Sequence, residues 1–111
     1  MSEVTELQDH LKVLSKQVKL KEQVKRLLDN EDFKDVILTG FCKDEMARCM
    51  KLAVYDKISA DQRDLYIQLA KSSAALDNYL NTLIILGNIA EEDMNEVQQQ
   101  IEELLVNGED E

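Results

Sequence analysis

The fold is decided first by residues 4–18, VTELQDHLKVLSKQV. Apolar side chains recur there at alternating intervals of three and four residues: Val4, Leu7, Leu11, Leu14 and Val18. This spacing puts them on one stripe of an α-helix and is typical of a coiled-coil seam. Ser2 or Thr5 can cap the start of the helix, which we expect to run to about Asp29.

A second stretch with the same spacing lies near the end of the chain, over about residues 89–106. Its apolar side chains are Ala90, Met94, Val97, Ile101 and Leu104. The two stretches differ in charge: residues 12–26 hold six basic residues and one acid, a net +5 (six minus one), whereas residues 91–111 hold nine acids and no base. We therefore expect the first and last helices to pair, either within one chain or between chains.

Further helices are expected between these two. Asn30 or Asp29 can cap a short helix that Gly40 ends, because glycine readily adopts the left-handed conformation found after a helix. A helix over about residues 41–55 follows. Residues 59–62, SADQ, form a capping box that opens a helix to about Leu86, where Gly87 predicts a break or a kink. We expect this helix to be the centre of the core, through Leu65, Leu69, Leu76, Tyr79, Leu80, Leu83 and Ile84.

The sequence thus predicts an all-α fold, a small helical bundle of four to five helices with coiled-coil-like N- and C-terminal helices. A length of 111 residues suits one domain, and the chain has no proline and three glycines. We expect a single helical domain over residues 1–106, made of a basic heptad-bearing helix (1–29) and a helical core (30–106). Residues 107–111 are expected to be a disordered acidic tail.

The net charge of −10 makes direct nucleic-acid binding an unfavourable hypothesis. No apolar run is long enough to span a bilayer, and the N-terminus lacks the pattern of a signal peptide, so a cytoplasmic location is expected. Cys42 and Cys49 lie seven residues apart in one predicted helix, about 10 Å at the helical rise, which excludes a disulfide between them. We interpret both as small buried hydrophobic residues.

Nothing in the sequence indicates catalysis. His10 is the only histidine, and its acidic neighbours favour an exposed helix position over a metal ligand. A glycine-rich phosphate loop and a nucleophile elbow are both missing from the sequence. We therefore expect no enzyme activity, no catalytic residue, no metal, no cofactor and no small-molecule substrate.

Two stretches resemble short helical proteins that tailed bacteriophages encode among their head and packaging genes. The first is residues 32–48, DFKDVILTGFCKDEMAR; the second combines residues 76–81, LDNYLN, with 86–91, LGNIAE. The similarity covers about residues 27–105. It implies a virion-associated or head-morphogenesis role, located in the host cytoplasm or the virion, and it brings no active site with it.

Two functional hypotheses follow. The first is an assembly protein that self-associates or docks on a larger protein through its terminal helices. Its contact residues would be Leu7, Leu11, Leu14, Val18, Met94, Val97, Ile101 and Leu104. The second is a monomeric inhibitor that binds a host nucleic-acid-binding protein through acids of the last helix. Those acids are Glu91, Glu92, Asp93, Glu96, Glu102 and Glu103.

Overall fold

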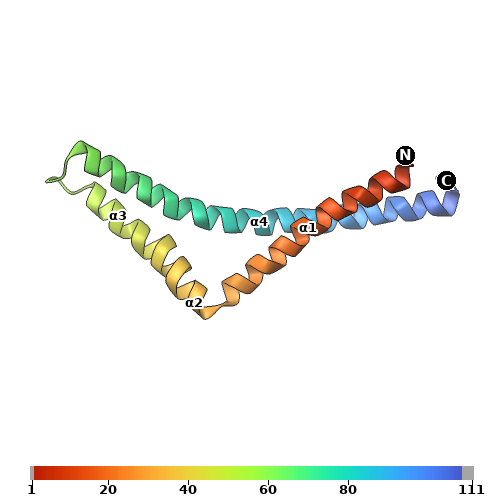
Figure 1. Cartoon of the computed structure of the whole chain (residues 1–111), viewed down its shortest axis with the longest axis horizontal. Coiled ribbons are helices and arrows are strands. Elements are labelled where there is room, and N and C mark those ends of the chain that lie inside the picture. Colours follow the sequence, from red (N-terminus) through yellow and green to blue (C-terminus); the bar gives the residue numbers. More distant parts are fainter. Residues whose placement is uncertain (1, 109–111) are drawn as a thin grey trace. The chain divides into compact units, whose positions relative to one another are not determined.

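The computed structural model describes residues 2–108, which are helical over almost their whole length and contain no strand (Figure 1). The elements are α1 (Glu3–Asp29), α2 (Glu31–Phe33), the π-helix η1 (Lys34–Glu45), α3 (Met46–Ala53) and α4 (Ala60–Asn107). The all-α prediction is confirmed. Because α2, η1 and α3 follow one another without a gap, the described residues form three continuous helices, and the prediction of four to five is wrong.

Side-chain oxygens cap the starts of these helices, as the sequence predicts. The Ser2 hydroxyl accepts from the Thr5 amide at 3.1 Å, and Asn30 Oδ1 accepts from the Phe33 amide at 2.9 Å. The capping box before α4 is reciprocal. The backbone N–H of Gln62 donates to Ser59 Oγ, and the backbone N–H of Ser59 donates to Gln62 Oε1, each at 3.1 Å. Amides that a helix start leaves without a backbone partner are satisfied in this way.

The two glycines predicted to end helices do not end them. Gly40 lies inside η1, and among the described residues only Gly108 has a positive φ, of 67°. Gly87 lies in the interior of α4, which continues for twenty residues beyond it to Asn107. Glycine in a helix costs only about 1 kcal/mol relative to alanine, so packing on the flanking residues can keep the helix continuous.

Contacts divide the chain into two compact units: unit 1 comprises residues 1–24 and 83–111, and unit 2 comprises residues 25–82. In unit 1, α1 and the C-terminal part of α4 run in opposite directions along each other (Figure 1). Their core joins Val4 and Leu14 of α1 to Ala90, Val97 and Ile101 of α4. Helix α1 and the C-terminal part of α4 thus pair inside one molecule.

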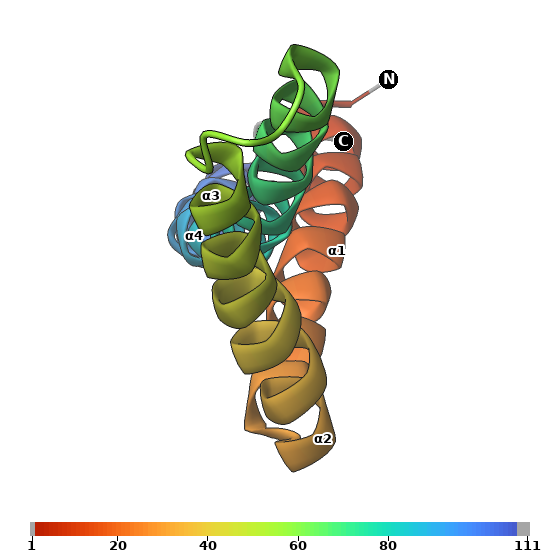
Figure 2. The same ribbon diagram turned by 90° about the vertical axis from the view of Figure 1, so that its left-hand side faces the viewer.

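In unit 2, α3 lies beside the N-terminal part of α4 (Figure 2). The buried side chains between these helices are small: Cys49 and Ala53 on α3, and Ala70 and Ser73 on α4. Small side chains allow two helices to approach closely. The loop after α3 is held by Arg63, whose Nε donates to the Ala53 carbonyl at 2.8 Å.

The predicted acidic tail lies mostly outside the described residues. Asn107 is the last residue of α4 and Gly108 forms a turn after it, so these two positions belong to the end of the helix. Residues 109–111 lie outside the described part of the chain.

Candidate protein-interaction surfaces

All eight residues predicted to carry a protein contact lie in the α1–α4 pair of unit 1. Leu14, Val97 and Ile101 are buried in its core. The other five are partly buried and pack against that core: Leu7, Leu11, Val18, Met94 and Leu104. The structure therefore brings the eight together within one chain, and their role in binding another protein stays a prediction.

The apolar seam of unit 1 contains one polar layer, at Lys21. This residue is only 4% exposed, an unusual degree of burial for a lysine. Its Nζ donates to Glu91 Oε1 at 2.6 Å, and the Glu91 side chain is 45% exposed. Among the described residues this is the one ion pair that joins α1 to α4. The whole Lys21 side chain is only 6% exposed, so its ammonium is buried beside a carboxylate that remains half exposed.

Gly87 makes this burial possible. A Cβ placed on Gly87 would lie 2.7 Å from Cδ and 2.9 Å from Cγ of Lys21, and closer still to its Cβ. These contacts are shorter than real Cβ atoms tolerate, and the crowded atoms lie near the Lys21 backbone. The glycine thus serves close packing between two helices. A glycine inside a helical pattern is visible in the sequence, but it also indicates a helix break. The sequence alone therefore does not separate the two roles.

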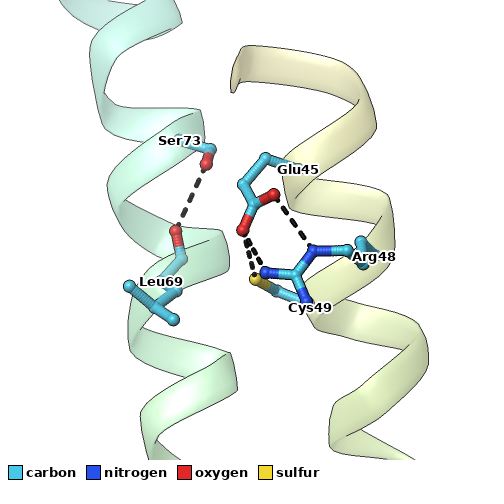
Figure 3. Close-up of polar contacts among 5 residues, drawn as sticks. All are labelled: Glu45, Arg48, Cys49, Leu69 and Ser73. Carbon is cyan, nitrogen blue, oxygen red and sulfur yellow. Dashed lines mark hydrogen bonds and ion pairs between the residues drawn. The ribbon is translucent and has the colours of Figure 1, made fainter. Parts of the chain in front are cut away.

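The seam of unit 2 contains polar groups that are all satisfied locally. Arg48 donates from Nε to Glu45 Oε2 at 3.1 Å, and its Nη2 pairs with Glu45 Oε1 (Figure 3). Cys49 Sγ lies 3.5 Å from the same Oε1, and Ser73 Oγ donates to the Leu69 carbonyl at 3.3 Å. Arg48 and Glu45 thus form an ion pair between two residues three positions apart.

Both cysteines are buried free thiols, as predicted. Burial raises the pKa of Cys49, and the nearby Glu45 carboxylate raises it further. Burial also raises the pKa of Cys42; the charge of Asp77 raises it further, and a hydrogen bond to the Asp77 backbone acts in the opposite direction. A thiolate is the reactive form of cysteine, so both environments keep these side chains unreactive near neutral pH.

The side of α4 predicted to be the centre of the core is partly open. Leu80 is buried, whereas Leu65 is 52%, Leu69 40% and Tyr79 56% exposed. The physical reason is that α3 packs on the side of α4 that presents its small residues. Two of these exposed positions directly precede a buried one: Leu69 precedes Ala70, and Tyr79 precedes Leu80. Neighbouring residues diverge by about 100° around a helix.

We name this exposed stripe the open face. It consists of Leu65, Leu69, Ser72, Leu76 and Tyr79. The intervals are four, three, four and three residues, which is heptad spacing. The stripe belongs wholly to unit 2, and Leu76 is its least exposed apolar member. The sequence contained this spacing, but the exposure could only be seen in the fold.

A shallow groove lies on another side of α4 in unit 2. It has a volume of about 450 Å³ and is lined by Met46, Met50, Ile67, Ala70, Lys71 and Ala74. Its lining is wholly apolar. In unit 1, His10 lines a separate hollow together with Glu3, Glu6 and Glu103. His10 is exposed, as expected.

The described residues include no group of three or more His, Cys, Asp or Glu side chains arranged to hold a metal ion. Within the same part of the chain, none of the helices combines the length and apolar character that crossing a bilayer requires. No family model, curated protein or solved structure matches this chain.

Proposed function

We propose that this protein is a non-enzymatic helical assembly protein that works by self-association or by docking on a larger protein. The setting we propose is the virion or head assembly of a tailed bacteriophage, in line with the sequence resemblance over residues 27–105. The protein would then act in the host cytoplasm or in the virion.

The observation that carries this proposal is the exposure of the open face. Leucine and tyrosine at heptad spacing normally cover a partner helix, and here three of them are at least 40% exposed to solvent. Scattered exposed apolar residues are ordinary on protein surfaces, but an ordered apolar stripe marks a contact site. The eight terminal-seam residues pack between the chain's own helices, and a contact between them and another protein stays a prediction.

The test is the absolute mass of the purified full-length chain, measured by light scattering after size-exclusion chromatography. Apolar contacts are insensitive to salt, whereas surface ion pairs weaken as salt rises. We expect a mass that is a multiple of the chain mass at low and at high salt. A mass equal to one chain at both salts and at every concentration tested contradicts self-association.

A second candidate is a monomeric acidic inhibitor of a host nucleic-acid-binding protein. One observation favours it: Glu92, Glu96, Glu102 and Glu103 are exposed on α4. Glu91 is committed to Lys21 and contributes less to such a surface. Capture of a basic protein from a bacterial lysate should then be lost at high salt and in a variant with these four acids changed to Gln. Capture that survives both changes contradicts this candidate.

A further inference from the structure

We infer that the open face of α4 binds the open face of a second copy of this chain. The inference rests on the proposed assembly function and names its contact. Two observations support it: the amount of apolar surface that α4 leaves uncovered in unit 2, and the absence of charge along that surface.

The uncovered surface is ordered along one helix. From Leu65 to Tyr79 the open face extends over fourteen residue steps, about 21 Å at the helical rise. Ser72 lies at its midpoint, with two apolar residues on each side. In unit 2, the neighbouring stripe of Ala70, Ser73 and Leu80 is buried. An apolar heptad stripe of this kind fits best against another helix with the same spacing.

The distribution of charge favours a second copy as the partner. The chain has a net charge of −10, so two copies repel each other wherever their acids meet. Residues 65–82 contain only Lys71 and Asp77 as charged residues, a net of zero (one minus one). The open face itself contains none. Like faces can therefore meet here without the like-charge repulsion that residues 12–26 or 91–111 would cause.

Neither charged residue of this segment belongs to the open face. Asp77 is exposed but directly follows Leu76, so it diverges from that residue by about 100° around the helix. Lys71 lines the groove beside Met46 and Met50. A partner that depends on charge would find no opposite charge on the open face, whereas an identical copy needs none.

The first experiment compares three single variants with the wild type by light scattering and by sedimentation. Leu69→Glu and Tyr79→Glu place a carboxylate on the open face. Val36→Glu is the matched control, because Val36 is 65% exposed on η1 and outside the open face. We expect each open-face variant to raise the dissociation constant about tenfold or more, and the control to match the wild type. Circular dichroism establishes that each variant keeps its helices.

The second experiment needs no charged variant. In a Ser72→Cys variant, a short bis-maleimide should link two copies covalently through the new thiol. The native Cys42 and Cys49 are buried and have raised pKa values, so they contribute little to this reaction. A Val36→Cys variant is the control, and we expect it to link at least tenfold more slowly.

The outcomes separate this inference from the proposed function. If the wild type is oligomeric, and both open-face variants keep its mass while Ser72→Cys links no faster than Val36→Cys, the inference is wrong and assembly uses another surface. If the wild type is a single chain at all concentrations and Ser72→Cys links no faster than the control, self-association itself fails. Loss of mass in the open-face variants alone, with fast linking at residue 72, supports the inference.

Discussion

Lys21 occupies the space that a side chain at residue 87 would need, and Gly87 leaves that space free. The lysine chain can cross the seam of unit 1 because α4 has no Cβ at this point. Its Nζ then reaches Glu91, one helical turn further along α4. A single polar layer in an apolar helix pair fixes which residues face each other, because any shift of register leaves the ammonium buried without a partner.

The Gly87→Ala variant should be less stable than the wild type, although alanine is the better helix former. The added Cβ overlaps the base of Lys21 and forces the two helices apart. Overpacking of this kind costs about 1 to 3 kcal/mol, against a gain of about 1 kcal/mol in helix propensity. Thermal unfolding followed by circular dichroism measures the difference. Asn88→Ala is the control, since Asn88 is exposed on the same helix and should not destabilise it. A melting temperature above the wild-type value for Gly87→Ala would disprove the packing role.

Glu91→Ala should destabilise unit 1 because it leaves the Lys21 ammonium buried without a carboxylate. The cost should be about 1 to 3 kcal/mol, less than for a fully buried pair because Glu91 is half exposed. Adding Lys21→Met should recover much of this loss, since methionine fills the same volume without a charge. Urea unfolding of the two single variants and the double variant gives the coupling between the residues. Strictly additive losses would mean that the pair contributes no interaction of its own.

The stability of unit 2 should fall at alkaline pH because of its buried thiols. Burial raises the pKa of Cys49, so the folded state retains the thiol proton at pH values where the unfolded chain releases it. The stabilisation is fully present below the unfolded thiol pKa and is lost as the pH rises through the folded pKa. The difference in melting temperature between the wild type and Cys49→Ala should therefore narrow between neutral and alkaline pH. A constant difference over this range would count against burial of the thiol.

The Ser59→Ala variant should lose about 0.5 to 2 kcal/mol, the usual contribution of a helix N-cap. The backbone N–H of Gln62 then has no side-chain acceptor at the start of α4. Ser59→Asp keeps an acceptor and should stay close to the wild type. Urea unfolding of both variants checks the difference, and equal losses in the two would show that the hydroxyl makes no specific contribution.

The sequence by itself determined the helices and their starts. Heptad spacing identified the pairing of the first and last helices, and the side-chain oxygens at Ser2, Asn30 and Ser59 identified three helix starts. These signals are local, since a cap and a stripe both depend on residues within one or two turns. The sequence did not decide whether these helices pair inside one chain or between two chains.

Only the tertiary structure decided what Gly40 and Gly87 do, and which side of α4 is covered. A glycine signals weak helix propensity, but whether it ends a helix depends on what packs against it, and at Gly87 this is Lys21 from the other end of the chain. The leucines of α4 likewise predict a buried stripe, yet α3 packs instead on the neighbouring side of α4, where the small residues Ala70 and Ser73 are buried. Burial depends on close packing between distant segments, and the sequence of a single helix does not contain it.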